Sequence, residues 1–450
     1  TPSVRPLSGR ALVRAGLSMM REWRRVVREG PRNFAVMKDM AMTYQAGRIG
    51  SLSAKEVAET LERLGQWLDG HEVTFGIAGG VAQSLQAMGT FLPGWLGEDW
   101  RELLNASLQG QGSVISAQHI LRVAELVEVA RNEVLVQRWF LSEGWTAARF
   151  REALADTEFL RRFEAYLADY GHRAVGESDI MSPRIADQPD AVLVLLQTQL
   201  RVGKDVLPGE IISRQVERRQ DALTEIHRRF GWRRHRGIVF RWWYRRLSRF
   251  CALREANRHH LLYYSTAVRH LLLQLGERMV EQGILTQCDD VFYLTMDERS
   301  ALTAGAQRDW QRLVLERREE LARDTEVQVP DTIRDWEAVL EQGSSMTSQE
   351  ADGVLRGIAV SAGTAAGPVR LVRSTDDWKR VRPGDILVVP VIDPGMAPLF
   401  GIAAGLIAEM GGTLSHGAII AREYGLPVLV NVPYASSLLR ENEQVEIVSS

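Results

Sequence analysis

A single histidine, His416, lies between glycines in the segment GGTLSHGAIIAREYGLP, residues 411–427. An apolar run precedes the two opening glycines, and a helical pattern follows them as far as the final glycine and proline. This order predicts a strand, a tight turn and a helix that begins close to His416. The free backbone N–H groups and the positive dipole end of such a helix favour a bound phosphate. A neutral imidazole is nucleophilic near pH 7, so His416 is suited to accept and pass on a phosphoryl group.

Spacing alone leaves two interpretations of His416 open, because a histidine after a Gly-Gly turn is often a helix cap or a packed core residue. The full string of seventeen residues, however, resembles the phosphohistidine motif of the PEP-utilising enzyme family. Segments 363–370 and 389–400 resemble other parts of the mobile domain of that family. The resemblance implies that His416 is the phosphorylated residue. It also implies a phosphate site lined by Thr413 and Ser415 and screened by Arg422, with Gly417 leaving room beside the imidazole.

A second group of chemically useful residues lies in the segment YGHRAVGESDIMSPR, residues 170–184. Its candidate acceptor-site residues are His172, Arg173, Glu177 and Asp179. A base, two carboxylates and an arginine in one loop are suited to deprotonate an acceptor hydroxyl and to offset developing phosphoryl charge. The alternative is an ion-paired loop that braces the surrounding helices. The segment resembles the acceptor-domain motif of rifampin phosphotransferase-like members of the family, which favours the first interpretation.

The most strongly charged part of the chain is residues 214–258, with fourteen arginines against four acidic residues and several tryptophans. Aromatic residues among arginines are one pattern of nucleic-acid binding. Apolar residues recur at helical spacing in this region, however, and acidic stretches elsewhere balance its charge. We therefore favour solvated or internally paired helix faces. A surface for an anionic ligand or an acidic partner domain is the second interpretation, and nucleic acid is the third.

Two regions of different pattern must position these groups. Up to about residue 342, amphipathic helical patterns dominate, at 54–68, 117–139, 146–170, 191–201, 211–230, 248–282 and 307–323. Residues 290–295 are an exception, since β-branched and aromatic residues there predict a strand. Beyond residue 353, short apolar runs are separated by Gly and Pro, at 357–360, 368–372, 386–391, 405–409, 427–430 and 445–448.

The predicted fold class is therefore a multidomain α and α/β protein. A large mainly helical acceptor domain occupies residues 1–342, and the small polar residues at 343–352 predict a flexible linker. A small α/β domain follows at residues 353–450, and the resemblance identifies it as the swivelling phosphohistidine domain.

Composition limits the remaining classes of protein. The chain has 450 residues, 45% of them hydrophobic, and a formal net charge of −2. Its apolar stretches are too short or too interrupted to span a membrane. Cys251 and Cys288 lack the spacing of metal ligands, so neither a metal site nor a disulfide framework is expected. Two cysteines without such a pattern fit a protein of the reducing cytoplasm. Because the chain opens with Thr1 rather than methionine and shows no signal-peptide pattern, we expect a fragment or a processed product.

The resemblance is strongest to rifampin phosphotransferase-like proteins that lack their ATP-binding module. Neither that module nor the PEP/pyruvate barrel of the dikinases has a counterpart in residues 1–450. The resemblance thus implies a phosphotransferase in which an ATP-grasp module, fused upstream or separate, binds Mg–ATP and charges His416. A small organic acceptor in the helical domain then takes the phosphoryl group. Neither nucleic acid nor a membrane is an expected partner.

Two other functions stay open at this stage. One is a synthetase, condensing or dehydrating enzyme that phosphorylates its substrate only transiently. The other is a non-catalytic phosphocarrier module. We disfavour it, because a carrier would not need a helical domain of about three hundred residues.

Overall fold

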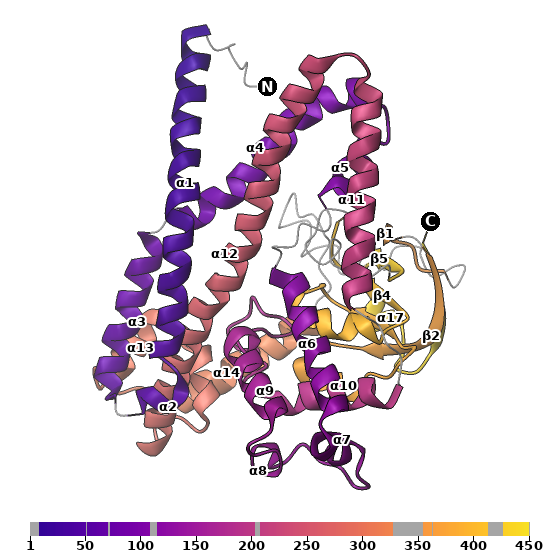
Figure 1. The fold of residues 1–450 in the computed structure, drawn as a ribbon. Coiled ribbons are helices and arrows are strands. Elements are labelled where there is room, and N and C mark those ends of the chain that lie inside the picture. The colour runs from indigo at the N-terminus through magenta and orange to yellow at the C-terminus, as the bar shows by residue number, and fades with distance from the viewer. Residues whose placement is uncertain are drawn as a thin grey trace.

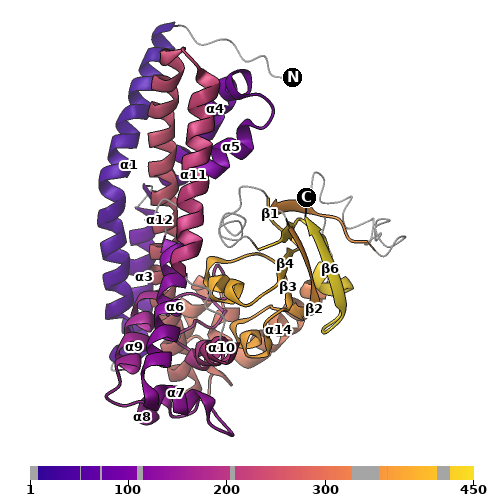
Figure 2. The same cartoon turned by 45° about the vertical axis from the view of Figure 1, so that its right-hand side comes forward.

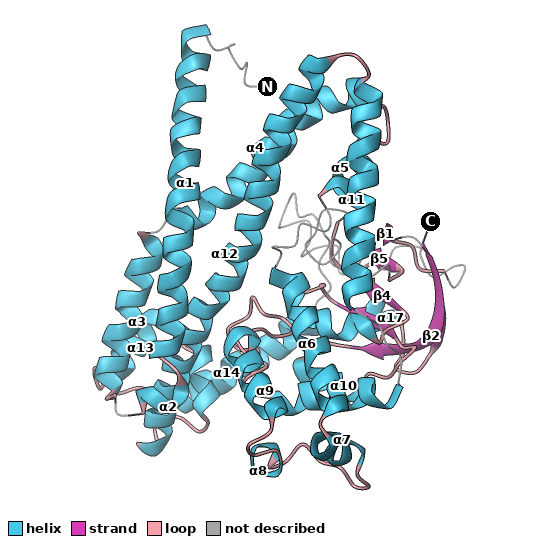
Figure 3. Cartoon of the chain, in the orientation of Figure 1, coloured by secondary structure: helices cyan, strands magenta, loops and turns pink. Residues whose placement is uncertain are grey.

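The computed structural model describes residues 9–50, 52–70, 73–108, 115–202, 208–326, 354–361, 363–412 and 426–449. A large assembly of helices is followed by a small α/β region at the C-terminal end (Figure 1). The strands gather in that region alone among the described residues (Figure 3). The predicted fold class is therefore confirmed. The predicted linker at 343–352 lies outside the described residues.

Long helices form the frame of the helical region. They are α1 (Gly9–Thr43), α4 (Val73–Leu96), α11 (Pro208–Phe230) and α12 (Arg234–Glu281). Helix α12 has 48 residues, which corresponds to about 70 Å, and α1 runs beside it (Figures 1 and 2). Helices α11 and α12 form a hairpin whose turn contains Gly231 at φ 55°. Buried Phe230 and Phe240 pack edge to face just beyond this turn, so apolar burial fixes the hairpin.

A second helical layer packs on the C-terminal half of α12. It contains α2 (Ala46–Ile49), α3 (Ala54–Asp69), η1 (Cys288–Tyr293), α13 (Met296–Thr303) and α14 (Trp310–Glu326). The start of α3 follows its sequence signature, because Ser53 and Glu56 form a reciprocal capping box. The strand predicted at 290–295 is wrong, since these residues begin in the 3-10 helix η1. The Asp290 carboxylate accepts hydrogen bonds from the N–H groups of Thr286 and Gln287, which stabilises a turn in place of an extended segment.

Shorter helices form a subdomain between the frame and the α/β region. They are α6 (Ile115–Asn132), α7 (Val134–Leu141), α8 (Phe150–Ala153), α9 (Glu158–Tyr170) and α10 (Pro189–Val202). Helix α5 (Trp100–Ser107) instead packs on α11 and α4 of the frame. The continuous helices predicted at 117–139 and 146–170 are each broken in two. The first breaks at Glu133, whose carboxylate accepts from the backbone N–H groups of Glu158 and Phe159 at 2.9 Å each. The second breaks before Thr157, whose hydroxyl caps α9.

The α/β region is built on one six-stranded sheet in the order β1-β5-β4-β3-β2-β6. Its strands are β1 (Ile358–Ser361), β2 (Gly363–Leu371), β3 (Ile386–Val389), β4 (Gly405–Ala408), β5 (Val428–Val430) and β6 (Gln444–Ser449). The four central strands are parallel, and β1 and β6 pair antiparallel at the two edges. Strands β3 and β4 are buried along their whole length, as expected for the centre of a parallel sheet covered on both faces.

Three short helices complete the α/β region, namely η2 (Thr375–Arg380), η3 (Pro394–Gly401) and α17 (Ala435–Leu438). Two of them join it to the helical region, since η3 contacts α6 and η2 contacts α10. One continuous apolar cluster runs through this contact and includes Phe140 and Phe163 on the helical side and Trp378 and Met396 on the other. The α/β region is therefore docked on the subdomain of short helices. None of the described helices combines the length and the apolar character needed to cross a membrane.

Candidate functional site

The loop that follows α9 contains all four predicted acceptor-site residues. It begins at Gly171, where an added Cβ would overlap the carbonyl oxygen of Leu167. Two backbone hydrogen bonds close it on itself, from Ile185 N to Arg173 O and from Ala186 N to Gly171 O, both at 2.8 Å. Residues 171–188, here called the junction loop, are thus held as a compact unit against α12 and the α/β region.

A buried ion pair lies at the centre of the junction loop. Arg173 Nη1 lies 3.1 Å from each carboxylate oxygen of Glu177, and the two side chains are only 2% and 0% exposed. The backbone carbonyl of Glu177 accepts a further hydrogen bond from Arg184 Nη1, at 3.1 Å. Two buried charges tolerate this position because each is paired and hydrogen-bonded. The Glu177 carboxylate is therefore not free to act as a base in this arrangement.

Arg258 of α12 connects this pair to the α/β region. Its Nε lies 2.8 Å from Glu177 Oε1 and its Nη2 lies 2.8 Å from Asp393 Oδ1. Asp393 directly precedes η3, and its other oxygen accepts from Gly176 N at 2.9 Å. Burial and the nearby Glu177 carboxylate raise the pKa of Asp393, an effect that Arg258 and the Gly176 N–H oppose. Charge-assisted hydrogen bonds therefore fix the α/β region to the junction loop.

Backbones also approach closely at this contact. Gly176 has φ 67°, a left-handed conformation that glycine adopts without strain and that directs its N–H to Asp393. Gly395 of η3 lies on the junction loop, and an added Cβ there would overlap the carbonyl oxygen of Ala174. The Val175 N–H donates a longer bond of 3.4 Å to Thr375 Oγ1 of η2. The contact thus depends on glycine on both sides, at Gly176 of the junction loop and at Gly395 of η3.

A cluster of buried aromatic and histidine rings lies behind the Arg173–Glu177 pair. The His172 ring lies 3.8 Å from the Tyr263 ring and 4.5 Å from the His259 ring, centroid to centroid. His259 Nδ1 lies 3.2 Å from Arg173 Nη2, and since a guanidinium only donates, that nitrogen accepts and the ring is neutral. His119 Nε2 lies 2.8 Å from the Tyr166 hydroxyl.

The environment keeps these histidines uncharged. Burial, followed by the neighbouring Arg173 guanidinium, lowers the pKa of His259 to about 2 and that of His119 to about 3. Burial and the nearby His259 lower the pKa of His172 well below its ordinary value. Both ring nitrogens of His172 are buried without a hydrogen-bond partner among the described residues. A buried, neutral and unpaired His172 is poorly placed to exchange protons with solvent.

The structure therefore separates the four predicted residues into two groups. His172, Arg173 and Glu177 are buried together, whereas Asp179 is exposed. The Asp179 carboxylate accepts from the Met181 backbone N–H at 2.9 Å, an ordinary turn interaction for aspartate. Arg173 and Glu177 thus form the ion pair that the sequence offered as the alternative interpretation of this loop. Asp179 is the one residue of the four that is exposed to solvent.

The sequence did not single out Arg258 and Asp393 for this site. Asp393 carries a usable signal, because it is the only charged residue among the apolar residues 386–408. Nothing in the sequence distinguishes Arg258, because it is one of many arginines in its segment. The contact between them joins positions 135 residues apart, which no local pattern reveals.

The predicted phosphate-site residues His416, Thr413, Ser415, Gly417 and Arg422 lie outside the described residues. The elements on either side of that segment are described. Strand β4 ends at Ala408 before Gly411 and Gly412, and β5 begins at Val428. An added Cβ on Gly412 would meet nothing within 4 Å. The neighbouring Glu409 carboxylate accepts from the Ser436 N–H at 2.7 Å, which ties this end of the sheet to α17.

Comparison with known proteins finds two family models that match separate parts of the chain. Residues 74–255 match the family described as rifampicin phosphotransferase fourth domain, and residues 381–450 match the family described as PEP-utilising enzyme, mobile domain. A rifampicin phosphotransferase from a Streptomyces species is 34% identical over 291 residues, which cover 63% of this chain and 33% of that protein.

Two further relatives cover more of the chain at lower identity. The rifampicin phosphotransferase of Streptomyces sviceus is 29% identical over 369 residues, covering 78% of this chain and 41% of the relative. That of Bacillus cereus is 24% identical over 359 residues, with the same two coverages of 78% and 41%. This chain thus spans about a third to two fifths of the length of these relatives.

Proposed function

Since the chain carries a rifampicin phosphotransferase fourth domain and a mobile domain of the PEP-utilising enzymes, we propose that it transfers a phosphoryl group on His416 to a small organic acceptor. The helical region holds the acceptor, and the mobile domain, residues 353–450, carries the phosphoryl group to it. Mg–ATP, bound by an ATP-grasp module and not by either of these domains, is the donor.

The proposed reaction has two half-reactions. In the first, an imidazole nitrogen of His416 attacks the β-phosphorus of ATP, and water takes up the γ-phosphoryl group. Phosphohistidine, AMP and inorganic phosphate result. In the second, an acceptor hydroxyl attacks the phosphohistidine, the P–N bond breaks as the P–O bond forms, and the hydroxyl proton leaves to the imidazole or to a nearby base. Histidine suits both steps because its neutral nitrogen is a nucleophile and its phosphoramidate stays reactive.

The observation that carries the proposal is the docked contact of the mobile domain with the junction loop. Asp393 binds both Arg258 and the Gly176 N–H, and η3 and η2 pack on the short helices. Such a contact gives the mobile domain a defined resting position on the helical region. Effective positioning of a carried group is a large part of phosphoryl-transfer catalysis.

In this proposal the four residues of the junction loop have different roles. Arg173 and Glu177 are positioning residues, because they hold Arg258 and the loop in the geometry that receives Asp393. His172 packs behind them. Asp179 is exposed and is the member that we assign to the acceptor site, where a carboxylate is suited to take the hydroxyl proton.

Docking must also be reversible, because one histidine has to meet ATP on one module and the acceptor on another. The apolar cluster that joins Trp378 and Met396 to the short helices has to separate in each cycle. Its burial stabilises the docked state, so we expect undocking to contribute to the turnover time.

The two half-reactions can be tested separately. The chain is supplied with the ATP-binding module of a relative and with ATP labelled at the β-phosphorus, and then freed of nucleotide. Rifampicin, the acceptor named for the relatives, is added first, followed by a panel of other phenols and alcohols. We expect label to enter the protein and then to leave it with an acceptor, as a stable phosphorylated product. A phosphoprotein that keeps its label with every acceptor would contradict the proposal and support a phosphocarrier.

A further inference from the structure

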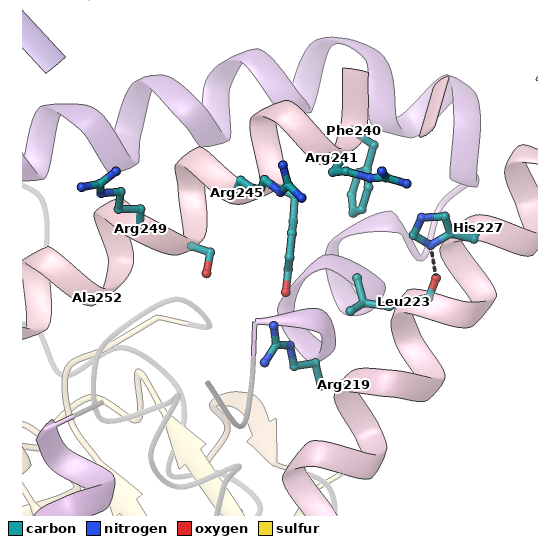
Figure 4. A pocket seen from close by; sticks show the side chains of 10 residues that line it. Arg219, Leu223, His227, Phe240, Arg241, Arg245, Arg249 and Ala252 are labelled. Carbon is teal, nitrogen blue, oxygen red and sulfur yellow. Dashed lines mark hydrogen bonds between the residues drawn. The ribbon is translucent and has the colours of Figure 1, made fainter. Parts of the chain in front are cut away.

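A pocket of about 530 Å³ opens between α11 and α12, close to their hairpin turn. Figure 4 shows Arg219 reaching toward it from α11, opposite Arg241, Arg245 and Arg249 on α12. The buried rings of Phe240 and Tyr244 form part of its wall. Its volume is that of a site for a small organic molecule.

The pocket concentrates positive charge without compensation. Arg241, Arg245 and Arg249 are spaced four residues apart, so they lie on one face of α12 and repel one another. None of the described residues that line the pocket is acidic. Nowhere in the part of the chain that the structure describes does an acidic side chain pair with any of the four arginines. The Nε of Arg219 is buried and has no hydrogen-bond partner among those same residues.

Other arginines of residues 214–258 have an acidic or aromatic partner within the chain. Arg228 and Arg229 pair with Glu225, Arg258 pairs with Glu177 and Asp393, and Arg246 lies over the ring of Trp23. Internal pairing, which the sequence favoured for this segment, therefore accounts for these arginines but not for those of the pocket. Arg241, Arg245 and Arg249 are exposed to solvent, so water and salt screen their mutual repulsion, and a bound anion would offset what remains of it.

The aromatic wall adds a second requirement for the ligand. The rings of Phe240 and Tyr244 stack at 5.4 Å between centroids and 20° between planes. The Tyr244 hydroxyl already donates to the Ser107 carbonyl at 2.5 Å, which leaves its ring rather than its hydroxyl to line the pocket. Beside this wall, His227 Nδ1 lies 2.6 Å from the Leu223 carbonyl oxygen, which fixes the imidazole on α11 (Figure 4). The partly exposed side chains of Leu223 and Ala252 complete the apolar lining that a ring of the ligand would contact.

We infer that this pocket binds a small organic anion in which a carboxylate or phosphate group is attached to an aromatic ring. The planar guanidinium groups match the oxygen pairs of both anions, and the wall takes the ring. Nucleic acid is the less suitable ligand, because a pocket of about 530 Å³ has the size of one small molecule. Arg228, Arg229 and Arg246 beside it already have partners within the chain. The inference concerns binding alone and does not depend on phosphoryl transfer.

Calorimetric titration of the full chain with naphthyl phosphate and naphthoate tests this inference. Neutral naphthol supplies the ring without the charge, inorganic phosphate supplies the charge without the ring, and a short single-stranded oligonucleotide represents nucleic acid. We expect saturable binding of at least one of the two aromatic anions with one ligand per chain, and at least tenfold weaker binding of naphthol and phosphate. Equal affinity for naphthol, or tighter binding of the oligonucleotide, would overturn the inference.

The matched variants are Arg245→Gln in the pocket and Arg234→Gln in the first turn of the same helix. Both arginines are exposed, so neither substitution should unfold the chain, and Arg245→Gln should leave the melting temperature unchanged or slightly higher. Loss of one charge-assisted contact should weaken binding of the aromatic anion about 10- to 100-fold in Arg245→Gln. Arg234→Gln should bind as the unmodified chain does. Equal affinity of the two variants would also overturn the inference.

Discussion

Arg258 Nη2 lies 2.8 Å from Asp393 Oδ1, and this ion pair joins the longest helix of the frame to the segment that opens η3. The same guanidinium holds Glu177 through its Nε. One side chain thus couples the junction loop to the mobile domain. The docked position therefore depends on a carboxylate at residue 393 and on the buried pair behind it.

Asp393→Asn tests the charge in this contact. Asparagine retains the shape and can still accept from the Gly176 N–H, but it removes the charge that faces Arg258. We expect normal phosphorylation of His416 and a loss of about 10- to 100-fold in the rate of transfer to the acceptor, as for other hydrogen bonds to charged groups. Rapid-quench measurement of label leaving the phosphoprotein gives this rate. Asp376→Asn, an exposed carboxylate of η2, is the control, and an equal effect of the two would refute the role of Asp393.

Gly395→Ala tests the close approach of the backbones. A Cβ at residue 395 would overlap the Ala174 carbonyl oxygen, whereas one at Gly401, in the same 3-10 helix, meets only Gln199 Nε2 at 3.8 Å. Gly395→Ala should therefore slow transfer to the acceptor at least tenfold and leave His416 phosphorylation intact. Gly401→Ala should transfer at the rate of the unmodified chain. If the two variants behave alike, docking through η3 is not required.

Much of the frame is predictable because its signals are local. The capping box of Ser53 and Glu56, the periodic helices and all six strands follow from residues close together in sequence. The failures have tertiary causes. Glu133 interrupts a predicted helix because its carboxylate caps a different helix, α9, and residues 290–295 form a turn around Asp290 instead of a strand.

The same distinction holds for the site. The spacing of Arg173 and Glu177 already allows an ion pair, and the structure shows that pair. The link from Arg258 to Asp393 was not predictable, since it depends on how two regions that are far apart in sequence pack on each other. The sequence showed the arginines of the pocket only as part of an arginine-rich segment. Periodicity does not reveal which of these arginines have acidic neighbours.

Glu177→Gln and Asp179→Asn separate the structural part of the junction loop from the proposed acceptor site. Glu177 is buried between two arginines, so its substitution leaves buried positive charge and should lower the free energy of unfolding by about 3–5 kcal/mol. Asp179 is exposed, so its substitution should change stability by less than about 0.5 kcal/mol and yet slow transfer to the acceptor. Urea unfolding and the second half-reaction measure both effects. A normal transfer rate in Asp179→Asn would exclude that carboxylate from the acceptor site.

The buried histidines predict loss of stability in mild acid. The pKa values of His172, His259 and His119 are all lowered in the folded chain, so between those values and about 6.5 the unfolded chain binds more protons. The stability that they contribute is complete above about pH 6.5 and falls as the pH decreases, by roughly 1.4 kcal/mol per pH unit for each histidine.

His172→Phe tests this titration directly. The substitution removes two unpaired ring nitrogens and should reduce the slope of unfolding free energy against pH by about one proton between roughly pH 6 and 5. His235→Gln alters an exposed histidine and should leave the slope unchanged. Denaturant unfolding at several pH values supplies the slopes. An unchanged slope in His172→Phe would show that this ring does not titrate on unfolding.

If the phosphoryl group travels on His416, the position of a phosphorus label on the chain shows it. The unmodified chain and His416→Ala are each incubated with β-labelled ATP and an ATP-binding module that labels its own mobile domain. We expect acid-labile, base-stable label on the unmodified chain and none on His416→Ala, with both chains equally folded by circular dichroism. Equal label on the two chains, or none on the unmodified chain beside a labelled control domain, would contradict it.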